Sequence, residues 1–91
     1  MTDLKSSNNI PYTVYILRCA DDTLYTGIAL DVAQRLIEHN TSDKAAKYTR
    51  ARRPLTLVYH ESCENKSIAL KREIAIKKMK RSQKEELLCS H

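Results

Sequence analysis

Two short runs of strand-forming residues, separated by a turn, constrain the fold more than any other feature of this chain. Residues 12–19 (YTVYILRC) and residues 24–29 (LYTGIA) are rich in β-branched and aromatic side chains. The intervening Asp21, Asp22 and Thr23 are typical of a turn. Because so short a connection joins antiparallel strands, the sequence predicts a β-hairpin at the start of the folded region.

The remaining sequence predicts helices and one further strand. Together with the hairpin they give the order β-β-α-(α)-β-α-α, an α+β fold in which helices lie on a small three-stranded sheet. The first predicted helix is capped by Asp31, has Gln34 at the capping-box position and ends near Asn40. A short basic helix over residues 43–50 and a strand over residues 55–60 follow. The next helix is capped by Asn65 or Ser67 and ends near Lys80, and a capping box at residues 82–85 opens the last helix.

The length of 91 residues allows one domain with one small core. Residues 1–10 are polar and are predicted to form a flexible tail, with a single domain over residues 11–91. This tail lacks the apolar stretch of a signal peptide, and the three cysteines are odd in number and widely spaced, so no disulfide framework is expected. These features predict a cytoplasmic location, and no segment has the length needed to span a bilayer.

The net charge of +5 favours a polyanionic partner, and nucleic acid before a membrane surface. The alternative is a basic protein whose charge only keeps it in solution. Clustering of the basic residues favours nucleic acid. The first cluster supplies the candidate contacts Lys47, Arg50, Arg52 and Arg53, and the second comprises Lys77, Lys78, Lys80, Arg81 and Lys84.

Two tyrosines and two basic side chains of the first half could together act on a phosphodiester. Arg35 and His39 are four residues apart on one predicted helix, so they project from the same face. Arg35 could hold a phosphate through two hydrogen bonds, although an ordinary solvated helix face would look the same. A three-residue loop places Tyr15 and Tyr25 on one face of the hairpin, and a two-residue loop places them on opposite faces.

Glu73 and Gly27 are unusual for their surroundings. Glu73 has mostly apolar neighbours one helical turn away, and a buried carboxylate costs several kcal/mol unless it is paired. Either Arg72 or a lysine shields it, or it holds a cation. Gly27 is the only glycine of the chain and lies within a predicted strand. It marks either a bulge or a place where another backbone or a phosphate comes close.

In order and spacing, these residues resemble the motifs of the GIY-YIG nuclease superfamily, and the chain is most similar to its small stand-alone bacterial members. The resemblance extends from residue 12 to about residue 90. The first motif reads Thr13-Val14-Tyr15 and the second Tyr25-Thr26-Gly27; Arg35 stands at the family's arginine position, His39 at its second polar position on that helix, and Glu73 at its metal-binding glutamate.

The resemblance implies a three-stranded antiparallel sheet flanked by helices and metal-dependent cleavage of nucleic-acid phosphodiesters. Glu73 would carry one divalent ion, Mg²⁺ or Mn²⁺. One tyrosine, more often the equivalent of Tyr25, would help to deprotonate the attacking water, and Tyr15 would position the water or the phosphate. Arg35 would hold the phosphate, and His39 would orient a phenol or share in proton transfer. Tyr48 lies where some members have another polar active-site residue.

Three functions follow as hypotheses. The first is an endonuclease acting on DNA rather than RNA, in repair or recombination. The second is a nucleic-acid-binding module that has the fold without turnover, and the third is an adaptor whose basic surface docks on an acidic protein. No second domain supplies target recognition, so a partner protein could direct the activity. A domain this small is expected to be a monomer or a weak homodimer.

Overall fold

The computed structural model describes residues 10–89, so the predicted tail lies outside the described region except for Ile10. No helix among the described residues is long and apolar enough to cross a bilayer. Along the chain the elements are β1 (Tyr12–Arg18), β2 (Leu24–Ala29), α2 (Val32–Thr41), α3 (Lys47–Arg50), β3 (Thr56–Cys63), α4 (Lys66–Lys77) and α5 (Arg81–Cys89).

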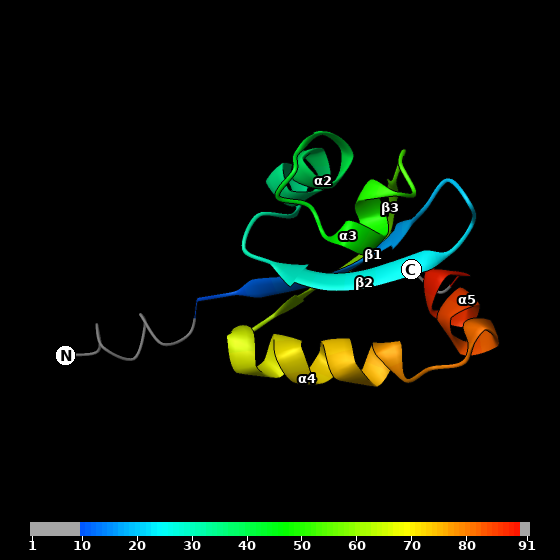
Figure 1. Cartoon of the computed structure of the whole chain (residues 1–91). Helices are drawn as coiled ribbons and strands as arrows, with labels where there is room; N and C mark the ends of the chain where they lie inside the picture. The colour runs from blue at the N-terminus through cyan, green and yellow to red at the C-terminus, as the bar shows by residue number, and fades with distance from the viewer. Residues whose placement is uncertain (1–9, 90–91) are drawn as a thin grey trace.

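The three strands form one antiparallel sheet in the spatial order β2-β1-β3, with β1 at the centre. Helices α2 and α3 lie on one face of this sheet, and α4 crosses the other face (Figure 1). The predicted α+β class and the predicted order of elements are therefore confirmed.

The register of the hairpin settles which way its tyrosines face. Leu17 pairs with Tyr25 and Tyr15 pairs with Gly27, so the two phenols share one face of the sheet. The connection that produces this register is of odd length, as the one-face alternative requires. Asp22 turns the chain with a φ of 70°, a left-handed conformation that aspartate tolerates better than most residues.

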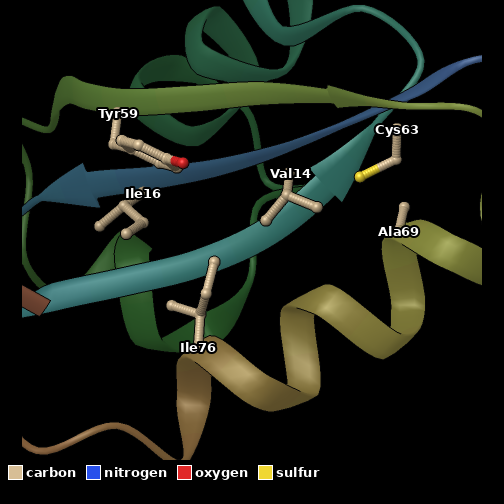
Figure 2. Packing of buried hydrophobic residues seen from close by; sticks show 6 residues of the cluster. All are labelled: Val14, Ile16, Tyr59, Cys63, Ala69 and Ile76. Carbon is tan, nitrogen blue, oxygen red and sulfur yellow. The ribbon is translucent and has the colours of Figure 1, made fainter. Parts of the chain in front are cut away.

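Strand β1 is buried on both faces, and each face belongs to a different apolar cluster. Val14 and Ile16 pack against Ala69 and Ile76 of α4, in the layer that Figure 2 shows between the sheet and the helix. On the opposite face the cluster beneath α2 contains Tyr15, Leu17, Cys19 and Leu55, with Val32 and Leu36 packed against it. The central strand therefore couples the two layers of helices.

The predicted caps of the two longer helices are present. The Asp31 carboxylate accepts the Gln34 amide at 3.0 Å, and the Asn65 side chain accepts the Ile68 amide at 3.0 Å. Of the two candidates for the cap of α4, Asn65 is the one observed, while Ser67 lies inside the helix.

Several predicted boundaries were wrong. Helix α3 begins at Lys47 rather than at residue 43, because Ala46 has a non-helical backbone with φ −58° and ψ 143°. Strand β3 continues to Cys63 because it pairs with the whole length of β1. Helix α4 ends at Lys77, not near Lys80.

The start of α5 also differs from the prediction. The Gln83 side chain accepts the Lys80 amide at 2.8 Å, and the Gln83 and Lys84 amides bond to the Lys80 carbonyl. Lys80 is therefore the residue at which the helix is capped, two positions before the predicted Ser82. The predicted partner of Ser82, Glu85, pairs with Arg81 instead, at 2.6 Å.

Candidate active site

A chain of hydrogen bonds joins three buried side chains from three elements. The Tyr15 hydroxyl on β1 lies 2.9 Å from Nε2 of His39, in the last turn of α2. The other ring nitrogen of His39, Nδ1, lies 2.8 Å from Oγ1 of Thr49 on α3. Since none of the three side chains reaches solvent, they hold the sheet, α2 and α3 in one fixed arrangement.

Gly27 lies directly beneath the Tyr15 phenol. A Cβ atom at position 27 would stand 2.6 Å from the Tyr15 hydroxyl oxygen and 2.7 Å from the ring carbon that bears it. The space therefore requires glycine, whereas its backbone conformation does not, because its φ is not positive. The protein group that comes close is a tyrosine ring rather than another backbone. The pairing of β1 with β2 is unbroken there, so the alternative of a bulge is wrong.

Tyr25 completes an aromatic cluster at the mouth of the site. Its ring centroid lies 5.2 Å from that of His39 and 6.5 Å from that of Tyr15, and Tyr48 stacks on it at 6.0 Å. Among residues 10–89 the Tyr25 hydroxyl meets no hydrogen-bond partner, and no buried polar atom there is left unsatisfied. The Tyr25 hydroxyl must therefore reach solvent, where a ligand can approach it.

Burial and charge act in opposite directions on Tyr15. Burial, and then the neighbouring Tyr25, raise the pKa of the Tyr15 phenol to about 12, while the charge and hydrogen bonding of Arg35 lower it. Arg35 is half-buried on α2 and its Nη1 lies 2.9 Å from the Glu38 carboxylate. The structure thus brings Arg35 to the same phenol that His39 contacts, and Tyr15 is neutral at physiological pH.

His39 is also neutral. Burial, followed by the charges of Arg35 and Arg53, lowers the pKa of the His39 imidazole to about 4, and Glu38 opposes the shift. Arg53 donates from Nε to the carbonyl of His39 at 2.6 Å and from Nη2 to the carbonyl of Ser42 at 2.6 Å. This guanidinium therefore satisfies carbonyls at the C-terminal end of α2 and fixes the turn that carries His39.

Glu73 approaches the site from the other layer. It lies on the inner side of α4 between the buried Ala69 and Ile76, its side chain is 16% exposed, and its carboxylate lies 3.4 Å from Nζ of Lys77. A lysine therefore shields it, whereas Arg72 pairs with Glu61 at 3.1 Å. The negative charge of Glu73 raises the pKa of Tyr15, so the carboxylate lies close enough to act on that phenol.

The surroundings of Glu73 fit an ion such as Mg²⁺, which keeps most of its water ligands, better than a metal whose ligands all come from protein side chains. Among the residues that the structure describes, no three His, Cys, Asp or Glu side chains come together as metal ligands. Mg²⁺ commonly keeps most of its water ligands and is held by one or two carboxylates together with substrate phosphates. A single, nearly buried carboxylate matches that mode of binding.

The predicted nucleic-acid contacts divide into two pairs. Lys47 and Arg50 project from α3 into solvent. Arg52 is held by the Asp21 carboxylate at 3.0 Å and lies 3.8 Å above the Tyr48 ring, and Arg53 binds the end of α2. Contact with phosphate stays a prediction for all four residues, but Arg52 and Arg53 already bind other groups of the protein.

Sequence reasoning missed Thr49 and gave Tyr48 only a minor place. Tyr48 is 39% exposed and links the Tyr25 ring to the Arg52 guanidinium. Thr49 is fully buried and contacts His39, which lies ten residues earlier, on the other side of the loop between α2 and α3. The residues around Thr49 are basic and show no hydrophobic periodicity that would predict its burial against His39. The buried side of a four-residue helix cannot be inferred from so short a pattern.

Over residues 11–86 the sequence matches the family model described as the GIY-YIG catalytic domain. The chain belongs to the GIY-YIG family. Relatives of this GIY-YIG chain include the UPF0213 protein DP2720 of Desulfotalea psychrophila, which is 55% identical over 75 residues, or 82% of this chain and 68% of the relative. The UPF0213 protein SSP2268 of Staphylococcus saprophyticus is 49% identical over 75 residues, covering 82% of this chain and 90% of the relative. The predicted resemblance to small stand-alone GIY-YIG proteins is confirmed.

Two solution NMR structures share the fold of this GIY-YIG domain. The UPF0213 protein BH0048 of Bacillus halodurans is 40% identical, with a TM-score of 0.57 over 87% of this chain and 83% of the other. The protein EF2693 of E. faecalis is 39% identical, with a TM-score of 0.60 over 88% of this chain and 84% of the other.

Proposed function

We propose that this GIY-YIG domain is a metal-dependent endonuclease that hydrolyses phosphodiester bonds, in DNA rather than RNA. The observation that carries the proposal is the meeting of four groups at one phenol. Tyr15 contacts His39, packs beside Tyr25 and responds to the charges of Arg35 and Glu73. These contacts and charge effects link residues of β1, β2, α2 and α4, and they support a shared site of the kind that hydrolysis of a phosphodiester requires.

The two tyrosines are suited to different tasks. Tyr15 is buried and neutral, and its hydroxyl already bonds to His39, so it is suited to positioning. Tyr25 has a hydroxyl that reaches solvent and no protein partner among residues 10–89. Tyr25 is therefore the better candidate for the group that takes the proton of the attacking water, and Tyr15 for the group that orients the water or the phosphate.

Arg35 and Glu73 supply charge on either side of the phenols. The half-buried Arg35 guanidinium would hold the scissile phosphate and balance its growing negative charge, exchanging part of its bond to Glu38. Glu73 would hold Mg²⁺ or Mn²⁺ in place of its contact with Lys77. When bound, such an ion stabilises the leaving oxygen and lowers the pKa of a bound water.

Nicking of supercoiled plasmid in Mg²⁺ or Mn²⁺ tests the proposal directly. Wild type should nick, and Glu73→Gln or Arg35→Ala should lower the rate by at least about 100-fold, as loss of one electrostatic contact typically does. Glu64→Gln is the matched control for charge, since Glu64 is exposed in the bend between β3 and α4. Equal nicking rates for wild type and Glu73→Gln would contradict the proposal of a metal-dependent nuclease.

Two observations favour a second function, nucleic-acid binding without turnover. The carboxylate that would hold the metal is already paired with Lys77, and Tyr15 has a pKa of about 12. Under this alternative, wild type retains plasmid at low salt and forms no nicked product at any Mg²⁺ concentration. Binding would survive both Glu73→Gln and Arg35→Ala.

The setting that suits the first function is DNA repair or recombination. The basic face formed by Lys47 and Arg50 lies on α3, next to the aromatic cluster, so it would contact the backbone beside the scissile phosphate without reading sequence. Selection of a target would then fall to DNA structure or to a partner protein. Pull-down of a cleavage-directing partner, or preference for branched over linear duplex, would distinguish these two sources of selection.

A further inference from the structure

Tyr15, His39 and Thr49 form a buried series of hydrogen bonds. Counting the protons available to these bonds shows which ring nitrogen of His39 is protonated. Thr49 Oγ1 lies 2.8 Å from Nδ1 of His39 and 2.9 Å from the carbonyl oxygen of Ala46. A hydroxyl has a single proton, so Thr49 can donate to only one of these two atoms. With its proton on the Ala46 carbonyl, Thr49 must accept a hydrogen bond from Nδ1, which then carries the imidazole proton.

Tyr15 leads independently to the same result. Within the described residues, the only acceptor that its buried hydroxyl proton meets is Nε2 of His39, at 2.9 Å. Arg35 also interacts with this hydroxyl, but a guanidinium carries donors alone. If Nε2 were protonated, the Tyr15 oxygen would face two donors, and its own proton would be buried without an acceptor.

We propose that Thr49 is a positioning residue that fixes His39 as the Nδ1–H tautomer, so that Nε2 accepts the proton of Tyr15. The logic is that of other oriented histidines, in which the partner of one ring nitrogen decides what the second nitrogen can do. Tyr15 thereby keeps its proton turned toward His39 and its lone pairs toward Arg35. The catalytic consequence rests on the proposed function: the phenol oxygen presents an acceptor, in a fixed direction, to the attacking water.

The chain offers a clean way to remove the Thr49 hydroxyl. Thr49→Val keeps the branched shape, and the Ala46 carbonyl still accepts the backbone amides of Thr49 at 3.1 Å and Arg50 at 3.0 Å. No backbone group is therefore left unpaired in α3. Thr49→Ser is the conservative variant that retains the hydroxyl.

Long-range ¹H–¹⁵N correlation spectra of the imidazole test the tautomer without any substrate. A His60→Gln/His91→Gln background leaves His39 as the only histidine, and measurement near neutral pH keeps it uncharged. We expect a protonated, pyrrole-type Nδ1 and an unprotonated, pyridine-type Nε2 in this background and in its Thr49→Ser version. Thr49→Val should weaken that preference and populate the Nε2–H tautomer as well, because the Nδ1 proton loses its acceptor while the Tyr15 hydroxyl still favours an unprotonated Nε2. A protonated Nε2 in the parent background, or an unchanged tautomer in Thr49→Val, overturns the proposal.

Plasmid nicking tests the catalytic consequence separately. Thr49→Val should lower kcat by about 10- to 100-fold, the range for groups that orient a functional imidazole, with KM unchanged and with recovery in Thr49→Ser. Wild-type kcat in Thr49→Val, when its tautomer has changed, overturns the catalytic part. If the wild type shows the Nδ1–H tautomer and cleaves nothing, the assignment of Thr49 to His39 is supported and the proposed nuclease is contradicted.

Discussion

The phenol of Tyr15 fills the space in which residue 27 of the paired strand would carry its side chain. Tyr15 and Gly27 are cross-strand partners, and a Cβ on residue 27 would overlap the Tyr15 hydroxyl. The glycine of the second motif thus serves the tyrosine of the first. This relationship fixes the height of the phenol above the sheet, where it meets His39.

Gly27→Ala should destabilise the domain by about 1–3 kcal/mol, the usual cost of overpacking. The physical reason is the clash with a rigid ring that is itself held by His39. Urea unfolding measures the effect. In a Tyr15→Val background, which empties the space, the same Gly27→Ala change should be neutral or stabilising, because alanine is the better strand residue. Equal destabilisation in both backgrounds would exclude the clash as the cause.

Stability should depend on pH through His39. Its folded pKa of about 4 lies below the unfolded value of 6.5, so at pH between these values the unfolded chain binds the extra proton. The contribution is fully present above pH 6.5 and is lost as pH falls toward 4, and it amounts to about 3 kcal/mol.

The free energy of unfolding measured from pH 8 to pH 4 checks this dependence. His39→Gln should flatten the curve between pH 6.5 and 4, whereas His60→Gln, at an exposed position on β3, should leave the slope intact. A wild-type slope that persists in His39→Gln would assign the titration to another group. The charged side chains that act on His39 are Arg35, Glu38 and Arg53, and all three remain in both variants.

Arg53→Ala should lower stability by about 1–2 kcal/mol, because the carbonyls of His39 and Ser42 lose a charged donor. Arg50→Ala, an exposed neighbour, is the control and should change stability by less than about 0.5 kcal/mol. Thermal unfolding of the two variants gives the comparison. Equal melting temperatures would mean that Arg53 does not hold the end of α2.

Tyr25→Phe should reduce nicking by about 100-fold or more, since it removes the phenol that reaches solvent. Tyr15→Phe removes the hydroxyl that bonds to His39, so it should reduce the rate less and should change the Nε2 signal of His39. Rates and ¹H–¹⁵N spectra of both variants separate the two roles. The opposite ranking of the two rates would exchange the roles of the tyrosines.

Lys47→Ala and Arg50→Ala should weaken DNA binding equally for unrelated sequences. Each lost phosphate contact should reduce the slope of log K against log salt by about 0.9 on duplex DNA. Fluorescence anisotropy over a range of NaCl concentrations measures both quantities. Lys71→Ala, an exposed change on α4 across the sheet, should have little effect, and an equal loss there would place the binding face elsewhere.

The hairpin and the motif residues were predictable because they depend on local rules. Alternation along β1 and β2 predicted that a loop of odd length would place both phenols on one face, but the loop length, and with it the facing of the phenols, came only from the structure. A helical spacing of four placed Arg35 and His39 together. These are short-range consequences of strand and helix geometry, and tertiary packing did not override them.

What sequence reasoning missed depends on contacts between distant segments. Arg53 was assigned to nucleic acid from its place in a basic cluster, yet it binds carbonyls eleven and fourteen residues earlier. The contact between Thr49 and His39 is hidden for the same reason. The partner of Glu73 was left open between Arg72, a lysine and a cation, and the structure shows Lys77, four residues later on α4.

Strand β1 joins two helical layers, and those layers are synthesised at different times. The tyrosines, Arg35 and His39 precede β3 in the sequence, whereas Glu73 follows it on α4. A growing polypeptide on the ribosome would therefore carry the phosphate-handling groups well before the acidic residue emerges. If the proposed nuclease activity holds, such an order would mean that hydrolysis cannot begin until α4 has been synthesised.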